Sequence, residues 1–244
     1  MSAPVLILGG SGGVGSALAR ALHSQGTSLH LFGRDRDRLE AVATETGNAR
    51  VTTVDVTDTE ALKEALTAAS RAEDGVAGLA YCVGSIVLKP LKRATPEDYL
   101  EAFRLNALGA ALAVQTAEPA LRKAKGSVVL FSTIAAGSGF TNHSVIAAAK
   151  GAVESLSRSL AADLAPDVRV NCIAPSLMQT PMSEPLIRNE TVAESIAKLH
   201  PIPRLGEAQD AASVAAFLLG PDSGWISGQV LPLDGGRSTL RVKG

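Results

Sequence analysis

A glycine-rich run directly follows the first apolar segment of the chain. Residues 5–8 are Val, Leu, Ile and Leu, the next seven residues include five glycines, and an apolar-periodic helical pattern begins at Ser16. Glycines let a backbone turn tightly and approach a pyrophosphate, which then meets free amides at the positive end of the helix. The order of strand, loop and helix therefore predicts a dinucleotide site. Its expected contact residues are Gly9, Ser11, Gly12, Gly13, Val14 and Gly15.

Short apolar runs alternate with longer helical patterns along the rest of the chain. Each run is nearly continuous in Val, Ile, Leu or Ala, as expected of parallel strands buried on both faces. The alternation predicts an α/β, doubly wound (Rossmann) fold, with a parallel seven-stranded sheet flanked by helices in a single domain over residues 1–244. The expected strands are 5–8, 28–32, 50–54, 78–83, 127–131, 168–173 and 229–233, and the clearest helices are 13–25, 36–46 and 59–71.

Two segments interrupt this alternation. Thr95 as N-cap and Pro96 at the first helical position open a long helix that passes through Asn106 towards Ala117. Residues 176–203 contain four prolines and show no strand pattern. Because an insertion of this length lies near the end of the sheet, we expect it to form a substrate lid.

The bulk properties of the chain limit its partners. The formal net charge is −1, without a long run of either sign, so there is no electrostatic reason to expect nucleic acid or an anionic membrane. Cys82 and Cys172 lie in apolar surroundings that suit a reducing compartment. The first residues lack the basic region of a signal peptide, and no apolar stretch reaches the length of a membrane span. We expect a cytoplasmic protein that acts on a small molecule and holds no metal ion.

The motifs resemble those of the short-chain dehydrogenase/reductase family over nearly the whole chain. The spacing Gly9-x-x-x-Gly13-x-Gly15 is similar to the family's TGxxxGxG motif, with Leu8 in place of its threonine. The segment 171–180 resembles NxxxPGxxxT, with Ser176 in place of glycine. The resemblance implies nicotinamide contacts by Pro175 and Thr180. It also implies a homo-tetramer or homo-dimer, formed through two long central helices.

The end of the second strand indicates which dinucleotide binds. An acidic residue there holds the ribose diol of NAD, whereas an arginine just beyond it pairs with the 2′-phosphate of NADP. Gly33 and Arg34 occupy these positions, so NADP(H) is preferred and NAD(H) stays possible. Arg34 is alternatively an exposed loop charge, and Asp35 alternatively a helix cap. Asp55 and Val56 resemble the family's adenine-contacting pair, although Asp55 or Asp58 can equally cap the next helix. Gly84 is the glycine retained from the family's NNAG motif.

Three positions resemble catalytic residues of the family. Asn106 matches the asparagine that holds a proton-relay water at a helix irregularity, and Lys150 matches the lysine that holds the nicotinamide ribose hydroxyls. The family's serine lies thirteen residues before its tyrosine, an interval that leads here to Thr133, directly after Ser132. A threonine keeps the hydroxyl that polarises a substrate carbonyl. The simpler interpretations are a surface asparagine and a solvated lysine.

The family's tyrosine is the main departure, because Ile146 stands four residues before Lys150. On one helix face, a lysine at i+4 lowers the pKa of the phenol so that it exchanges a proton near neutrality. Isoleucine has no such proton. His143 precedes Lys150 by seven residues, the interval at which some enoyl reductases of the family place their tyrosine, and imidazole suits acid–base work. Tyr81 is a second candidate acid. Alternatively, His143 helps to cap the helix and Tyr81 is a core residue.

Two functions remain open from the sequence. The first is an NADP(H)-dependent oxidoreductase of the short-chain type, with a non-standard active site, acting on a small carbonyl or activated alkene. The second is a catalytically impaired dinucleotide-binding protein, either a redox sensor or a partner subunit. The retention of Asn106, Thr133 and Lys150 together favours the enzyme.

Overall fold

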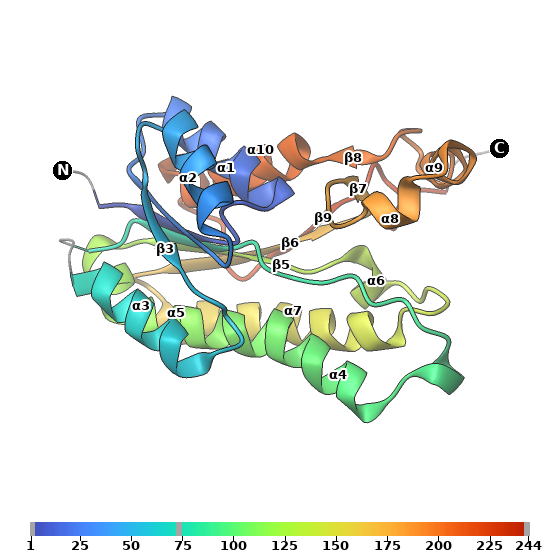
Figure 1. Cartoon of the computed structure of the whole chain (residues 1–244), viewed down its shortest axis with the longest axis horizontal. Coiled ribbons are helices and arrows are strands. Elements are labelled where there is room, and N and C mark those ends of the chain that lie inside the picture. Colours follow the sequence, from blue (N-terminus) through green and yellow to red (C-terminus); the bar gives the residue numbers. More distant parts are fainter. Residues whose placement is uncertain (1–2, 72–74, 242–244) are drawn as a thin grey trace.

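A seven-stranded parallel sheet forms the centre of the protein (Figure 1). The computed structural model describes residues 3–71 and 75–241, so the rest of the predicted domain, 1–2, 72–74 and 242–244, lies outside the described residues. Every neighbouring pair of strands in this sheet is parallel, in the order β3-β2-β1-β4-β5-β6-β9. The strands are β1 (Val5–Leu8), β2 (Leu29–Gly33), β3 (Arg50–Thr53), β4 (Gly78–Tyr81), β5 (Ser127–Phe131), β6 (Arg169–Pro175) and β9 (Val230–Leu233). The predicted doubly wound fold is confirmed.

Helices cover both faces of the sheet (Figure 1). On one face lie α1 (Gly13–Ser24), α2 (Arg36–Glu45) and α10 (Ala208–Leu219). On the other lie α3 (Thr59–Arg71), α4 (Pro96–Phe103), α5 (Gly109–Ala124) and α7 (Ser144–Leu164). The remaining elements are the 3-10 turns Leu91–Arg93 and Pro221–Ser223, α6 (Ile134–Gly137), α8 (Glu184–Ile187), α9 (Glu190–Ala197), and the strand pair β7 (Met178–Gln179) with β8 (Gly206–Glu207).

Alternate side chains of each strand build two separate cores, because successive residues of a strand point to opposite faces. Leu6 and Leu8 pack among residues of α3 and α5. Val5 and Ile7 pack among residues of α1 and α10. All four side chains are almost fully buried. Burial on both faces explains why the β1 sequence is continuously apolar rather than alternating.

The structure corrects two details of the predicted sheet. The expectation that every strand is buried on both faces is wrong for β3 and β9, whose residues are exposed or half-buried. Each of these edge strands has only one neighbour in the sheet, so fewer elements cover it. The expectation of no strand within 176–203 is also wrong, because Met178 and Gln179 form β7 and pair with β8. Periodicity gives little signal for a strand of two residues.

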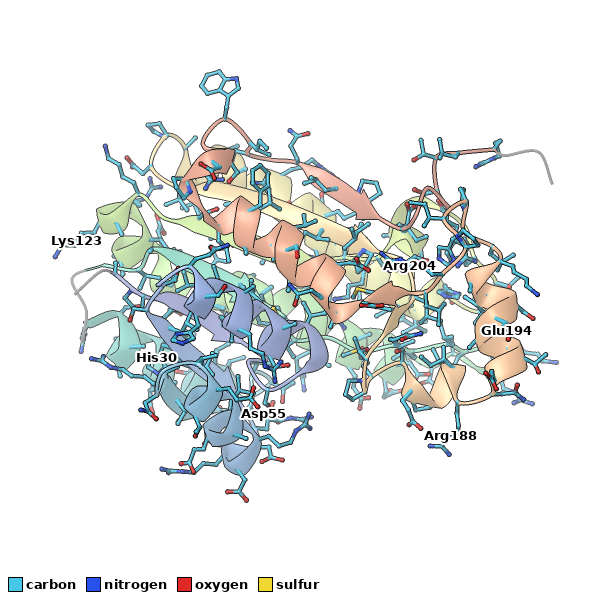
Figure 2. All side chains as sticks on the ribbon, turned by 90° about the horizontal axis from the view of Figure 1, so that it is seen from above. His30, Asp55, Lys123, Arg188, Glu194 and Arg204 are labelled. Atoms are coloured by element: carbon cyan, nitrogen blue, oxygen red, sulfur yellow. The ribbon has the colours of Figure 1, made fainter. Side chains whose placement is uncertain are left out.

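The carboxyl ends of the strands meet on the side of the molecule that carries α8 and α9. Figure 2 shows Arg188 and Glu194 there, opposite His30 near the start of β2 and Lys123 near the end of α5. In open α/β sheets, ligands bind outside the carboxyl ends of the strands. The fold therefore directs the search for a site to this side. Among the described residues, no helix combines the length and apolar character that a bilayer span requires.

Candidate active site

A large cavity opens at the carboxyl ends of the strands, with a volume of about 1140 Å³. Its walls come from the loops after β1, β2, β3, β4, β5 and β6, from the start of α7, and from α8 and α9. All of the predicted site residues except Gly15 and Asn106 line it, and Asn106 lies directly behind Gly84. The structure thus brings these residues, which are spread over most of the chain, together around one cavity.

The loop between β1 and α1 depends on glycines at two positions. Gly9 has a φ of 79°, the left-handed conformation that favours glycine. A Cβ atom at Gly15 would lie 2.1 Å from the Gly9 carbonyl oxygen, so only glycine allows the turn to close this tightly. Gly12, the N-cap of α1, has no side chain that could cap the helix, which leaves the first amides of the helix available to a ligand. The geometry fits a cradle for a pyrophosphate.

Two arginines lie beside this loop. Arg34 follows β2 directly, its side chain is 79% exposed, and Nη1 lies 3.9 Å from Asp55 Oδ2. Arg38, which the sequence analysis did not select, lines the cavity and donates from Nη2 to the carbonyl oxygen of Ser11 at 3.1 Å. Its only signal in the sequence is its place in the charged run that starts at Arg34. Asp35 accepts a hydrogen bond from the Arg38 amide and caps α2, as its alternative interpretation predicted.

Asp55 and Asp58 have separate roles after β3. Asp58 accepts a hydrogen bond from the amide of Ala61 in the first turn of α3, so Asp58 is the residue that caps this helix. Asp55 instead accepts hydrogen bonds from the amide and the hydroxyl of Thr57, which lower the pKa of its carboxyl group. Asp55 and the buried Val56 both line the cavity. The alternative that Asp55 caps α3 is therefore wrong.

Lys150 and Asn106 converge on Gly84, at the end of β4. A Cβ atom at Gly84 would lie 2.9 Å from Asn106 Oδ1 and 3.0 Å from Lys150 Nζ. Lys150 is only 7% exposed, and Nζ donates to the Phe131 carbonyl oxygen at 2.8 Å. Burial lowers the pKa of this ammonium to about 8, while the nearby Cys172 and Cys82 act weakly in the opposite direction. The interpretation of Lys150 as a solvated helix lysine is wrong.

Asn106 lies in a π-helical turn, Arg104–Leu108, that joins α4 to α5. The Gly109 amide bonds to the Arg104 carbonyl, five residues back, so the Leu105 carbonyl loses its helical partner. Asn106 is fully buried, with Nδ2 donating to the Ala102 carbonyl at 2.8 Å and Oδ1 accepting from the Ser85 amide at 3.3 Å. The predicted helix irregularity at this asparagine is present. A surface position for Asn106 is excluded.

Tyr81 fills the gap that this irregular turn creates. Its hydroxyl donates to the Leu105 carbonyl oxygen at 2.7 Å, and the side chain is 2% exposed. Burial raises the pKa of the Tyr81 phenol, and the charge of Asp55 raises it further. Tyr81 is absent from the residues that line the cavity. The alternative of Tyr81 as the catalytic acid is therefore wrong, and the core interpretation is correct.

Thr133 places a hydroxyl in the cavity at the end of β5. It is the N-cap of the short helix α6, and its Oγ1 accepts from the Ala135 amide at 3.3 Å. The hydroxyl hydrogen stays free to donate to a ligand, because the capping bond uses only an oxygen lone pair. Ser132 is differently placed, since its Oγ contacts the Lys150 carbonyl at 3.1 Å and Glu154 Oε1 at 2.8 Å. Thr133 is thus the more available hydroxyl.

Ile146 and His143 lie on the cavity wall at the start of α7. Ile146 is 4% exposed and presents an apolar surface one turn before Lys150. The chain has two tyrosines, Tyr81 and Tyr99, and Tyr99 lies on α4, outside the cavity lining, where its hydroxyl donates to Ser144 Oγ. His143 is the N-cap residue of α7, yet its side chain makes no capping bond, so the expectation that this side chain caps the helix is wrong.

The ring of His143 has a defined tautomer in its neutral form. Nδ1 lies 2.7 Å from the Thr141 carbonyl oxygen, which can only accept, so Nδ1 carries the hydrogen. Nε2 has no hydrogen-bond partner in the described part of the chain. The ring packs edge-on against Phe140, with the ring centroids 5.4 Å apart. The imidazole of His143 is therefore held by Thr141 and Phe140 at the wall of the cavity.

The segment after β6 closes the opposite wall. The Thr180 side chain packs against the junction of the β1–α1 loop with α1, because a Cβ atom at Gly13 would lie 3.0 Å from Thr180 Cβ. Pro175 ends β6 and lines the cavity together with Thr180. Residues of α8 and α9, including Leu186, Val192 and Ile196, line it further out. The predicted lid segment therefore contacts the site, and its closure stays a prediction.

The structure adds residues to the site that no sequence motif had indicated. Arg237, from the turn after β9, lies over the ring of Phe140 with its guanidinium carbon 4.7 Å from the ring centroid. Both residues line the cavity. They lie almost a hundred residues apart in the sequence, and neither belongs to a recognisable motif. Only the three-dimensional fold brings them together.

The thiols of Cys82 and Cys172 both favour the protonated form, which is not the nucleophile. Burial raises the pKa of Cys82 and of Cys172 to about 12, so both stay protonated at neutral pH. Over residues 3–71 and 75–241, no group of three or more His, Cys, Asp or Glu side chains is placed to hold a metal ion.

Comparison with known proteins agrees with this geometry. The family model described as enoyl-(acyl carrier protein) reductase matches residues 9–238. A chloroplastic tropinone reductase homologue of Arabidopsis thaliana is 34% identical over 242 residues, covering 96% of this chain and 74% of the relative. The structure of a short-chain type dehydrogenase/reductase from Mycobacterium ulcerans is 28% identical, with a TM-score of 0.90 over 99% of this chain and 92% of the other.

A further similar structure is that of ElxO with NADP bound, which is 25% identical to this chain, with a TM-score of 0.91 over 98% of this chain and all of the other. The match of the family model, the sequence relative and the shared fold all extend over nearly the full length of the chain. The chain belongs to the short-chain dehydrogenase/reductase family.

Proposed function

We propose that the protein is an NADP(H)-dependent oxidoreductase that acts on a small carbonyl compound or an activated alkene. One observation carries this proposal: a single cavity joins the phosphate-type glycine loop to Lys150, Thr133 and the Asn106–Gly84 contact. A protein that only bound a nucleotide would have no need for a hydroxyl and an ammonium beside the far end of the same site. The family relationship supports an oxidoreductase.

The preference for NADP(H) rests on the charge beside β2. Arg34 and Arg38 both line the cavity next to the glycine loop, and no acidic side chain occupies the position of Gly33. Guanidinium groups suit a 2′-phosphate, whereas a ribose diol is held by a carboxylate. The similar protein ElxO is known with NADP bound, which supports the same preference here. Asp55 also lies near Arg34, so NAD(H) stays a second possibility.

The residues of the chain have distinct tasks in this proposal. The dihydronicotinamide, when bound, supplies the hydride. The Lys150 ammonium holds the nicotinamide ribose, and the Asn106 turn positions a water molecule. The Thr133 hydroxyl donates a hydrogen bond to the substrate oxygen, where negative charge develops during reduction. Pro175 and Thr180 hold the nicotinamide from the opposite wall, and Asp55 with Val56 contacts the adenine.

The proton that completes the reduction comes from His143 or from water in this proposal, not from a tyrosine. Reduction of a carbonyl adds a hydride to carbon and a proton to oxygen, so a donor is required. Ile146 offers none, and the two tyrosines lie outside the cavity lining. The Nε2 atom of His143 is free of protein partners in the described residues, and His143 is one of the residues that line the cavity. This makes the active site a non-standard one.

The test is NADPH oxidation by the purified protein against a panel of aldehydes, ketones and enones. We expect turnover, and a decrease of about 100-fold in kcat for His143→Ala, within the usual range for general acids. The control is His23→Ala, in the last turn of α1, which leaves the cavity unchanged. If kcat is unaffected by His143→Ala, the proton comes from water and not from His143. Absence of turnover on the whole panel would contradict the oxidoreductase.

A second candidate is a catalytically impaired dinucleotide-binding protein, which the buried Ile146 favours. A redox sensor based on cysteine receives no support, because both thiols have a raised pKa. A partner subunit is the remaining form of this alternative. Ile146→Tyr separates the two functions from each other. In an impaired protein it creates turnover that Ile146→Phe, with the same ring and no hydroxyl, does not create.

We also propose that the protein forms a homo-dimer or homo-tetramer through its long helices. Gly151 in α7 has no atom within 4 Å of the position of an added Cβ, so this face of the helix is open. Small residues on such a face allow two copies of a helix to approach closely. Sedimentation equilibrium measures the subunit number, and a monomer would contradict the proposal. The cytoplasmic location stays a prediction.

A further inference from the structure

Arg237 introduces a positive charge into a part of the cavity where the other lining residues are mostly apolar. Arg237 contacts Phe140, and the cavity residues contributed by the segment after β6 include Met182, Val192 and Ile196. The carboxylates among the described lining residues are Asp35 and Asp55, which follow β2 and β3. A charge in apolar surroundings is costly unless a partner neutralises it. Among the described residues, Asp234 is the carboxylate whose charge acts on Arg237, and no lining residue at this end of the cavity is acidic.

The position of Arg237 in the sheet separates it from the phosphate-binding side. Arg34 and Arg38 follow β2, whereas Arg237 follows β9. The strand order is β3-β2-β1-β4-β5-β6-β9, so β9 and β3 are the two opposite edges. The catalytic residues Thr133 and Lys150 lie between them, near the ends of β4 and β5. Arg237 therefore lies beyond the catalytic centre, on the side where a substrate would extend.

The guanidinium of Arg237 contacts Phe140 and Ser176, and most of its donors are unused. One face lies over the Phe140 ring. Nη1 makes a long hydrogen bond of 3.5 Å to Ser176 Oγ, and this is its only side-chain hydrogen bond in the described residues. A guanidinium has five N–H groups. Asp234 lies nearby, but its carboxylate accepts hydrogen bonds from the amides of Gly236 and Ser238 instead.

Ser176 connects this arginine to a buried histidine. His200 is 4% exposed, and its Nδ1 lies 3.0 Å and 3.2 Å from the carbonyl oxygens of Ile196 and Ala197, so Nδ1 carries the hydrogen. In the neutral ring Nε2 then accepts from the Ser176 hydroxyl at 2.8 Å. The Ser176 lone pairs consequently face the Arg237 donor. The serine that replaces the family's glycine thus has a defined task in this chain.

We propose that Arg237 is the specificity-determining residue of the active site and binds a carboxylate group on a largely apolar substrate. Ser176, backed by His200, acts as the positioning residue for this guanidinium. The inference rests on the proposed oxidoreductase function and names its substrate class: a small carbonyl or activated alkene compound with a carboxylate at its distal end. Arginine matches a planar carboxylate with two parallel hydrogen bonds, which gives both affinity and orientation.

A carboxylate fits this end of the cavity better than a phosphate does. Arg237 is the single arginine or lysine among the described lining residues that follow β6 and β9. One guanidinium balances one negative charge, whereas a phosphate monoester carries between one and two at neutral pH. Burial lowers the pKa of Arg237, although the nearby Asp234 raises it, which is consistent with a cation partly removed from water.

Calorimetry of the protein loaded with NADP⁺ tests this proposal without turnover. The probes are benzoate, the isosteric but uncharged benzamide, and phenyl phosphate. We expect benzoate to bind roughly 10- to 100-fold more tightly than benzamide, as for a charged hydrogen-bonded pair removed from water. Phenyl phosphate binds more weakly than benzoate. Equal or undetectable binding of benzoate and benzamide would overturn the proposal, and so would the strongest binding by phenyl phosphate.

Three variants assign the effect to the residues. Arg237→Met keeps the length of the side chain and removes its charge, so the preference for benzoate disappears. Ser176→Gly reduces the preference severalfold, because the guanidinium loses its fixed partner. The matched control is Arg188→Met, which removes an exposed arginine paired with Glu184 on α8, outside the cavity lining (Figure 2). Persistence of the full preference in Arg237→Met would contradict the assignment.

Kinetics with paired substrates separates this inference from the proposed function. If the protein reduces aldehydes, Arg237→Met raises KM for 4-carboxybenzaldehyde and leaves KM for its methyl ester unchanged. Turnover without discrimination between acid and ester overturns the inference and supports the oxidoreductase. Carboxylate binding without turnover on any aldehyde supports the inference and contradicts the oxidoreductase.

Discussion

The two halves of the cavity are built in different ways. The half formed after β1, β2 and β3 depends on backbone: Gly9 needs a positive φ and Gly15 leaves no space for a Cβ atom. The half formed after β5, β6 and β9 depends on side chains such as Ile146, Ser176 and Arg237. The first half retains the family's glycine pattern, and Leu8 replaces the threonine that precedes it. The departures at positions 146 and 176 both fall in the second half.

The difference shows which parts of such a site can change while the fold stays the same. Gly9 and Gly15 in the β1–α1 turn cannot be replaced without moving backbone atoms, in a turn that connects a core strand to a core helix. Ile146 or Arg237 can be exchanged without altering any strand register, because each contributes only a side chain to the cavity. The cofactor half therefore limits the class of reaction, and the substrate half determines which molecule enters.

The largest expected effect tests the backbone half. In Gly15→Val, the new Cβ atom would lie 2.1 Å from the Gly9 carbonyl oxygen, so the loop must open. We expect cofactor affinity to fall more than 100-fold, measured by calorimetry with NADPH. Circular dichroism shows whether the fold persists, and Gly15→Ala gives a milder version of the same clash. Gly137→Ala is the control, since nothing lies within 4 Å of its added Cβ. Unchanged affinity in Gly15→Ala would show that the turn tolerates a Cβ atom, and would contradict a cofactor half that depends on backbone.

The next effect tests the junction of the two halves at Lys150. Burial lowers the pKa of this ammonium to about 8, so it is mainly charged below pH 8 and becomes neutral as the pH rises above this value. A neutral amine attracts the ribose and phosphate oxygens less, so NADPH affinity falls as the pH rises through about 8. Lys150→Met lowers affinity about 10- to 100-fold at pH 7 and removes this pH dependence.

Lys63→Met, which removes an exposed lysine from α3, is the control for this measurement. It leaves both the affinity and its pH dependence unchanged. The same alkaline decrease in Lys150→Met would assign the titration to another group. Cofactor binding where the two halves of the cavity meet would then depend on the backbone half alone.

A smaller effect concerns the charges at the outer end of the cofactor half. Arg34→Gln with Arg38→Gln removes both guanidinium groups beside β2, so the preference for NADPH over NADH falls about tenfold. The ratio of the two affinities is the measurement, because Arg38 also bonds to Ser11 in the phosphate loop and affects both cofactors there. Arg36→Gln is the matched control, since Arg36 pairs with Glu40 and does not line the cavity. An unchanged ratio would exclude these arginines as the source of selectivity.

The sequence could predict the strands and helices whose buried residues follow a regular apolar pattern. The bounds of β1, β5 and α3 agree with the predicted ranges, and the others differ at one or both ends. The cofactor half could also be predicted, because its glycines lie within one local motif. Arg237 could not, since its partner Phe140 is far away in the sequence. Ser176 was visible as a departure, but its role depends on His200, which only the fold places beside it.

The smallest effect concerns Tyr81, a departure that serves the fold rather than the chemistry. Its hydroxyl satisfies the Leu105 carbonyl that the π-helical turn leaves without a helical partner. Tyr81→Phe removes this bond and keeps the ring, so the free energy of unfolding falls by about 1 to 2 kcal/mol. Turnover changes less than threefold, because the Asn106 side chain keeps its bonds to Ala102 and Ser85. Urea unfolding and steady-state kinetics measure the two effects.

Tyr99→Phe is the matched control, because this half-buried tyrosine loses only a 3.2 Å bond to the Ser144 hydroxyl at the outer end of α7. Water can replace that partner, so the loss of stability is smaller than for Tyr81. A large decrease in kcat with unchanged stability in Tyr81→Phe would contradict the structural role. Tyr81 would then be, like Ile146, a departure from the family's motif that changes the chemistry of the site. If stability alone changes, the π-helical turn and its asparagine are maintained by a tyrosine where the family's motif has an asparagine.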